Sequence, residues 1–129
     1  MRRSRFLVLL TAGAIAGAMM AAPATAVLAD PVMFSILHTN DFHGQLEASG
    51  SNPGMARTAK VINNVRVANT ALGRDTLLVD AGDEMQGSLL SNLQKGEPTI
   101  AVYKAMGYDV ATFGNHEFDW GQTVLANRV

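Results

Sequence analysis

The sequence contains no cysteine among its 129 residues. Disulfide bonds, a lipid-modified cysteine and a zinc site built on thiolates are therefore excluded for this chain. Any bound metal ion has to be held by oxygen and nitrogen ligands. Basic residues are also few, because 10 Lys and Arg stand against 11 Asp and Glu and form no cluster after residue 5. This charge balance argues against a nucleic acid polymer as the main partner.

The first 26 residues have the pattern of a secretory signal peptide. A positive "MRRSR" precedes the uncharged apolar run Phe6–Ala22, and Ala24–Ala26 offers a small-residue cleavage site, with Ala29 as the alternative. An uncleaved anchor is the competing interpretation, because ~17–25 apolar residues can span a bilayer. The alanine-rich run and the cleavage site favour removal. We therefore expect an exported protein, periplasmic or extracellular, with no membrane partner after cleavage.

Strands and helices are predicted to alternate in residues 27–129. Strand-length apolar runs occupy Val32–His38, the stretch beginning at Thr76, and Asp109–Phe113. The second run is continuously apolar, which suits a strand buried on both faces. A helix is predicted from about Ala56 to Leu72, with an apolar face at helical spacing made of Val61, Val65, Ala68 and Leu72.

Two further helices complete the predicted pattern. Pro98 at a first turn and Gly107 just past an end bound one of them, and residues 122–129 could begin the other. The order βαβαβ(α) implies right-handed crossovers and an α/β fold with a mainly parallel sheet. The polar loops that follow the three strands then open at one edge of the sheet, where ligands bind in such folds.

Polar side chains are concentrated in those three loops. The first loop holds Asp41 and His43, the second holds Asp83, and the third holds Asn115, His116 and Asp119. Taken singly, each has a structural interpretation, such as a turn, a helix cap or a satisfied loop residue. Together their carboxylates would be costly to bury unpaired, and no Lys or Arg lies in these loops. Divalent cations would neutralise them. Carboxylate, imidazole and amide ligands suit Mn, Fe, Zn or Mg, and a central aspartate could bridge two ions.

His116 and Asp119 are three residues apart, so one helical turn would bring them to the same side. A carboxylate beside the imidazole would raise the pKa of His116. A cationic His116 could then stabilise charge on a transferring phosphate or protonate the leaving oxygen. Asn115 could give an amide oxygen to a metal ion or an N–H to the phosphate.

Three stretches, "ILHTNDFHGQLE", "LLVDAGDEMQGS" and "VATFGNHEFDWG", resemble the first three signature blocks of the calcineurin-like metallophosphoesterases. More narrowly, they resemble the secreted bacterial group of 5′-nucleotidases, UDP-sugar hydrolases and 2′,3′-cyclic-nucleotide phosphodiesterases. The resemblance implies that Asp41 and His43 hold a first metal ion, that Asp83 bridges two, and that Asn115 binds the second. It implies a catalytic pair of His116 and Asp119, with Asn115 and His116 contacting substrate. The implied cofactor is two divalent ions of Zn, Mn, Mg, Fe or Co.

The resemblance implies an α/β/β/α sandwich, of which these residues would supply part of one sheet. Other motif members are interpreted as supporting or loop-shaping residues, namely His38, Asn40, Asp80, Gln86, Ser88 and Glu117. The family completes its metal site with a G-H-x-H block and adds a nucleobase-binding domain, and neither is present in this sequence. We therefore expect an incomplete amino-terminal portion of a catalytic domain, which hydrolyses little by itself.

The expected activity is metal-dependent hydrolysis of nucleotide phosphate esters, with a small-molecule nucleotide or another phosphate ester as the partner. Two alternatives stay open at this point. The same family could act on cyclic nucleotides, UDP-sugars or sulfur compounds. The chain could instead be a non-catalytic exported binding module.

Overall fold

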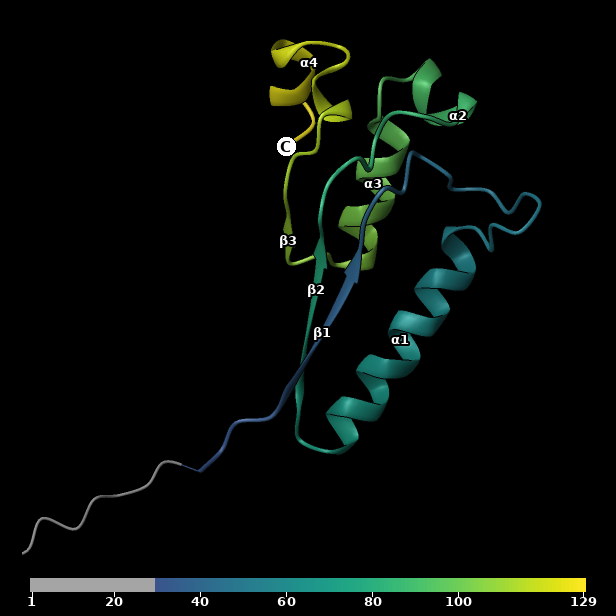
Figure 1. The fold of residues 1–129 in the computed structure, drawn as a ribbon. Helices are drawn as coiled ribbons and strands as arrows, with labels where there is room; N and C mark the ends of the chain where they lie inside the picture. Colours follow the sequence, from purple (N-terminus) through teal and green to yellow (C-terminus); the bar gives the residue numbers. More distant parts are fainter. Residues whose placement is uncertain (1–29) are drawn as a thin grey trace, which may run out of the picture. The chain divides into compact units, whose positions relative to one another are not determined.

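Three strands form one parallel sheet in the order β1-β2-β3. The computed structural model describes residues 30–129, so the predicted signal peptide lies outside the described residues. The strands are β1 (Phe34–Thr39), β2 (Asp75–Asp80) and β3 (Val110–Ala111). All pairings are parallel, with Phe34 opposite Asp75 and Val79 opposite Val110. The predicted α/β fold with parallel strands is thereby confirmed (Figure 1).

Strand β3 is shorter than the predicted Asp109–Phe113 because side-chain bonding replaces part of its ladder. The Asp109 carboxylate accepts the Leu78 N–H at 2.8 Å, where a backbone carbonyl would serve in a regular ladder. The Asp109 N–H in turn donates to the Leu78 carbonyl at 2.8 Å. At the other end of β3, the Thr112 N–H donates to the Asp80 carbonyl at 3.1 Å, so the chain is bonded to β2 on both sides of a strand only two residues long.

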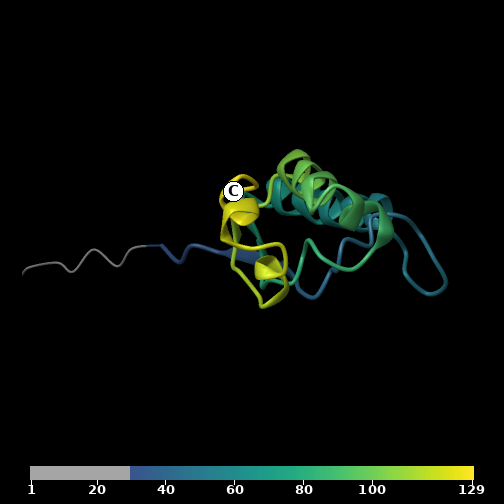
Figure 2. The same cartoon turned by 90° about the horizontal axis from the view of Figure 1, so that it is seen from above.

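Helices α1 (Met55–Ala71) and α3 (Glu97–Met106) lie on the same face of the sheet (Figures 1 and 2). This placement follows from two successive right-handed crossovers. Arg66 of α1 joins the two helices, since its guanidinium donates to the carbonyls of Met106 and Gly107, each at 2.6 Å. Gly107 ends α3 in a left-handed conformation, as predicted.

Three short elements complete the fold: α2 (Leu89–Leu93), the 3₁₀ turn η1 (His116–Phe118) and α4 (Gln122–Ala126). Helix α2 was not predicted. Its cap is Ser88, whose hydroxyl oxygen accepts the Ser91 N–H at 3.3 Å. No helix within residues 30–129 is long and apolar enough to cross a membrane.

Helix α1 buries a different face from the one its apolar spacing indicated. Val61 and Leu72, both in the predicted face, are 62% and 63% exposed. The buried residues are instead Met55, Ile62 and Asn69. Asn69 tolerates burial because its amide donates to the Thr76 hydroxyl at 2.7 Å. The prediction for this face was therefore wrong, although the helix itself is present.

The expectation that β2 is buried on both faces was also wrong. Leu78 faces the helices and is fully buried, whereas Leu77 on the opposite face is 36% exposed. The register places Phe34, Ile36 and Val110 on the same face as Leu77, and each is more than half exposed. Within the described residues, helices cover one face of the sheet and leave this apolar face open.

Candidate active site and metal centre

Asp41, His43 and Asp83 form a candidate ligand cluster at the carboxyl ends of β1 and β2. One ligand atom from each residue lies within 4.8 Å of the others. Backbone hydrogen bonds join the two loops, from Asp41 N–H to the Gly82 carbonyl at 3.0 Å and from His43 N–H to the Asp83 carbonyl at 2.9 Å. The predicted meeting of these loops at one sheet edge is confirmed.

All three members of the candidate ligand cluster have left-handed backbone conformations. Their φ angles are 51° for Asp41, 51° for His43 and 58° for Asp83. In the described residues, Lys95 is the one other non-glycine residue with positive φ. Such conformations are costly for residues with a Cβ and persist where the surrounding structure enforces them. The loops therefore hold these side chains against an intrinsic backbone preference.

The donor set of the candidate ligand cluster fits a divalent metal ion. The Nδ1 of His43 lies 2.9 Å from the Gln86 carbonyl, which can only accept a hydrogen bond, so the neutral ring carries its proton on Nδ1 and presents the lone pair of Nε2. That tautomer is the one metal-ligating histidines adopt through such an outer hydrogen bond. The ion pairs formed within residues 30–129 give neither Asp41 nor Asp83 a Lys or Arg partner. Two carboxylates and one imidazole nitrogen are thus available to a cation.

The predicted pairing of His116 with Asp119 is present across η1, between its first residue and the residue that follows its end. Nδ1 of His116 lies 2.7 Å from Oδ2 of Asp119, and both side chains are more than a third exposed. This hydrogen bond raises the pKa of His116 above its usual value. The His116 ring centroid is 5.2 Å from that of His43, which places the pair beside the candidate ligand cluster.

The loop after β3 is hydrogen-bonded directly to Asp83. The Oδ1 of the Asp83 carboxylate accepts the His116 N–H at 2.9 Å. A Cβ on Gly114 would lie 2.2 Å from the same Oδ1, so only glycine fits there. Asn115 stands between these two contacts and is exposed. Its service as a metal ligand and substrate contact stays a prediction.

Two buried carboxylates below this edge support the loops. Asp80, 3% exposed, accepts hydrogen bonds from the Gly82 N–H at 2.8 Å, from the Tyr103 hydroxyl at 3.0 Å and from the Thr39 hydroxyl. Glu117 is 1% exposed and bonds to the loop after β2. Both had been interpreted as supporting residues of the motifs.

Glu84 is a buried acid that the sequence did not single out. It is 2% exposed, and within the described residues its Oε2 has no hydrogen-bond partner. Burial, and then the neighbouring charge of Glu117, raise the pKa of Glu84 to about 8. No signal in the sequence distinguishes it from an ordinary exposed loop glutamate.

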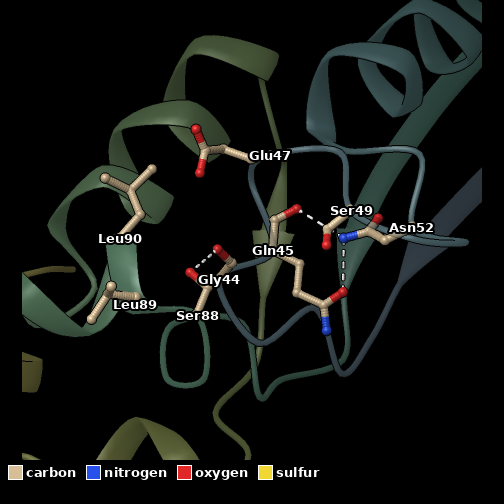
Figure 3. A pocket seen from close by; sticks show the side chains of 8 residues that line it. All are labelled: Gly44, Gln45, Glu47, Ser49, Asn52, Ser88, Leu89 and Leu90. Atoms are coloured by element: carbon tan, nitrogen blue, oxygen red, sulfur yellow. Dashed lines mark hydrogen bonds between the residues drawn. The ribbon is translucent and has the colours of Figure 1, made fainter.

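A hollow of about 320 Å³ lies between the loop that follows His43 and the start of α2 (Figure 3). One side is formed by the loop that begins at Gly44, directly after His43, and the other by Ser88–Leu90 at the start of α2. Asn52 donates to the Gln45 side-chain oxygen at 2.7 Å, which shapes the loop side. The hollow is therefore lined by polar groups and by the exposed leucines Leu89 and Leu90.

Comparison with known proteins finds that the chain is similar to part of several 5′-nucleotidases. No protein-family model matches it. Snake venom 5′-nucleotidase from Naja atra is 37% identical over 97 residues, covering 67% of this chain and 18% of the relative. Protein UshA from Yersinia enterocolitica is 35% identical over 125 residues, covering 94% of this chain and 23% of the relative. The chain thus spans about a fifth of the length of these relatives.

A solved structure to which the chain is similar carries the same enzyme name as the Naja atra relative. A protein from Staphylococcus aureus assigned as a 5′-nucleotidase is similar with a TM-score of 0.61 and 26% identity, covering 72% of this chain and 20% of that chain. Its likeness extends to the fold as well as to the sequence. In fold and in sequence the chain is therefore similar to part of the 5′-nucleotidases, in agreement with the resemblance of its three sequence blocks to the calcineurin-like metallophosphoesterases.

Proposed function

We propose that this chain contributes the metal-binding part of the active site of an exported phosphoesterase that hydrolyses nucleotide phosphate esters. The observation that carries the proposal is the candidate ligand cluster, with one ligand atom of each residue within 4.8 Å of the others, beside the His116–Asp119 pair. Relatives named as 5′-nucleotidases support nucleotides as the substrate class.

Four residues are proposed to hold two divalent ions of Zn, Mn, Mg, Fe or Co. Asp41 and His43 would hold the first, Asp83 would bridge both, and Asn115 would hold the second. When bound, such ions supply Lewis-acid polarisation and neutralise the charge of a phosphate group. The loops that hold Asp41, His43 and Asp83 in left-handed conformations already bring one ligand atom of each within 4.8 Å of the others, which supports this assignment.

His116 is proposed to act on the substrate phosphate. Because Nδ1–H of His116 donates to the Asp119 carboxylate in a 2.7 Å hydrogen bond, Nε2 is left to meet a ligand. The raised pKa keeps the ring protonated to higher pH, so Nε2–H can donate to a phosphate oxygen or give its proton to the leaving oxygen. Asn115, next along the loop, would supply a second contact to the phosphate.

Binding measurements test this proposal without depending on turnover by the chain alone. Retention of AMP by the purified chain is measured by equilibrium dialysis with Zn²⁺ and with a chelator. We expect AMP to be retained only with Zn²⁺, and Asp83→Asn to abolish the difference. Equal retention with and without the ion would contradict a metal-dependent phosphate site. The same dialysis with a cyclic nucleotide and a UDP-sugar ranks the alternative substrates.

Export is proposed from the amino-terminal pattern and has its own test. Expression in a bacterial host should yield a product outside the cytoplasm whose first residue is Val27 or Asp30, according to which predicted site is cleaved. Mass spectrometry of the amino terminus gives the answer. A product that retains residues 1–26 would contradict cleavage.

A further inference from the structure

Glu117 accepts hydrogen bonds from four backbone N–H groups while being only 1% exposed. Its Oε1 accepts from Glu84 at 2.9 Å and Met85 at 3.2 Å, and its Oε2 accepts from Asp83 at 2.8 Å and Gly114 at 2.7 Å. Both carboxylate oxygens are thus occupied by N–H donors. Glu117 therefore has no lone pair directed at a metal ion or a substrate, and its role must be exerted through its partners.

The four donors belong to two different loops. Those of residues 83–85 are successive and converge on one anion, which is the arrangement of a backbone nest. The fourth, Gly114, comes from the loop after β3. Buried N–H groups without an acceptor are destabilising. The Glu117 carboxylate is the acceptor for these four N–H groups, in place of the backbone carbonyls of the two loops.

These two loops carry the proposed catalytic groups. Asp83 belongs to the candidate ligand cluster, and its Oδ1 accepts the His116 N–H at 2.9 Å. The backbones meet where a Cβ on Gly82 would lie 2.5 Å from the Gly114 nitrogen. Glu117 directly follows His116 in the loop after β3 and accepts a hydrogen bond from the Asp83 N–H in the loop after β2. Its buried carboxylate therefore connects the two loops where they meet.

We propose that Glu117 is a positioning residue that fixes the loops after β2 and β3 in the one arrangement where Asp83 and the His116–Asp119 pair face a common site. The left-handed conformation of Asp83, with φ of 58°, is held by the N–H contacts of residues 83–85 to this carboxylate. The catalytic consequence rests on the proposed function, whereas the effect on the two loops does not.

Glu117→Gln tests the proposal, with Glu84→Gln as the matched control. Glu117→Gln keeps the shape of the side chain but replaces one acceptor oxygen with an NH₂ group, which faces the backbone N–H donors. Glu84 is equally buried, lies next to Asp83, and leaves its Oε2 unbonded in the described residues. Two readouts are taken on the full chain: hydrogen exchange at the four donor amides without metal, and Mn²⁺ affinity by electron paramagnetic resonance.

In Glu117→Gln we expect faster exchange at the amides of residues 83–85 and Gly114, unchanged protection in β1, and Mn²⁺ affinity weakened ~10–100-fold. Glu84→Gln should keep both the protection and the affinity. Unaltered exchange or unaltered Mn²⁺ affinity in Glu117→Gln would overturn the proposal. If the unaltered chain binds no Mn²⁺, the proposed function fails, and the exchange data still decide the role of Glu117 in the loops.

A second variant covers the case in which Glu117→Gln does not fold. Glu117→Asp keeps the charge on an arm shorter by one methylene, so we expect intact protection of β1 together with weaker Mn²⁺ binding. Mn²⁺ binding equal to that of the unaltered chain would overturn the proposal. Loss of β1 protection in both variants would also overturn it, because it would show a role in the whole fold rather than in the two loops.

Discussion

Gly114→Ala probes how tightly the loop after β3 is packed against Asp83. The new Cβ would lie 2.2 Å from Oδ1 and 2.7 Å from both Cγ and N of Asp83, where ordinary contact begins at 3.4 Å. The φ of Gly114 is not in the left-handed range, so the effect is steric and not conformational. The Asp83 carboxylate, or the Gly114 backbone, must move by about 1 Å to relieve the overlap.

The magnitude of this effect follows from three contributions. Overpacking costs about 1–3 kcal/mol, and weakening the hydrogen bond from Gly114 N–H to the Glu117 carboxylate costs a further ~1 kcal/mol. Alanine also reduces the conformational entropy of the unfolded chain, which stabilises the folded state by ~0.4–1 kcal/mol. A net loss of about 2–3 kcal/mol corresponds to a Tm lower by ~10–20 °C for a domain of this size.

Thermal unfolding followed by circular dichroism measures this loss, and Gly50→Ala is the control. Gly50, unlike Gly114, has a positive φ, 57°, and it has no atom within 4 Å of its Cβ position, so its substitution carries only the conformational cost of about 1 kcal/mol. Mn²⁺ affinity should fall in Gly114→Ala and stay unchanged in Gly50→Ala. If Gly114→Ala were no more destabilised than the control, the close packing of the two loops would be refuted.

Three further predictions concern groups around and below the site. Because the pKa of Glu84 is raised from 4.5 to about 8, the folded chain holds a proton that the unfolded chain releases, so stability should fall as pH rises from about 4.5 to about 8. Urea midpoints measured with a chelator should show this slope flattened in Glu84→Gln, and parallel curves would contradict it. Asp119→Asn should lower the pKa of His116, which NMR titration of the ring reads directly; an unchanged pKa would remove Asp119 as the cause. Arg66→Gln should cost about 1–2 kcal/mol in urea unfolding, because two 2.6 Å bonds to the end of α3 are lost from a half-buried guanidinium, while the exposed Arg57→Gln should change stability by less than ~0.5 kcal/mol. Equal losses in these two variants would contradict a bridging role for Arg66.

The elements that carry the site were predictable because their signals are local. An apolar run followed by a polar, glycine-containing turn indicates a strand and the loop after it, and parallel strands bring such loops to one edge. Asp41 and Asp83 were therefore expected to meet although they lie far apart in the chain. The pairing of His116 with Asp119 depends only on one helical turn, and a spacing of three residues specifies it.

The remaining features depend on contacts that no local pattern encodes. The buried face of α1 includes Asn69, a residue type that pattern rules assign to solvent. Its burial depends on a hydrogen bond to Thr76, which lies beyond the helix and is not part of the helical pattern. Helix α2 was missed because Leu89 and Leu93 are largely exposed and five residues give no periodicity. The contacts of Glu117 are to backbone N–H groups, and these carry no residue identity that a sequence could display.

The left-handed conformations of Asp41, His43 and Asp83 limit what can replace them, apart from their chemistry. Asn and Gly adopt such φ values readily, whereas Ala and β-branched residues do not. An alanine scan of these positions would therefore report backbone strain together with ligand loss, while Asp→Asn isolates the ligand. The same constraint bears on sequence drift: we expect homologues that no longer bind metal to carry Asn or Gly at these positions, and an alignment rich in Val, Ile or Thr there would contradict this expectation.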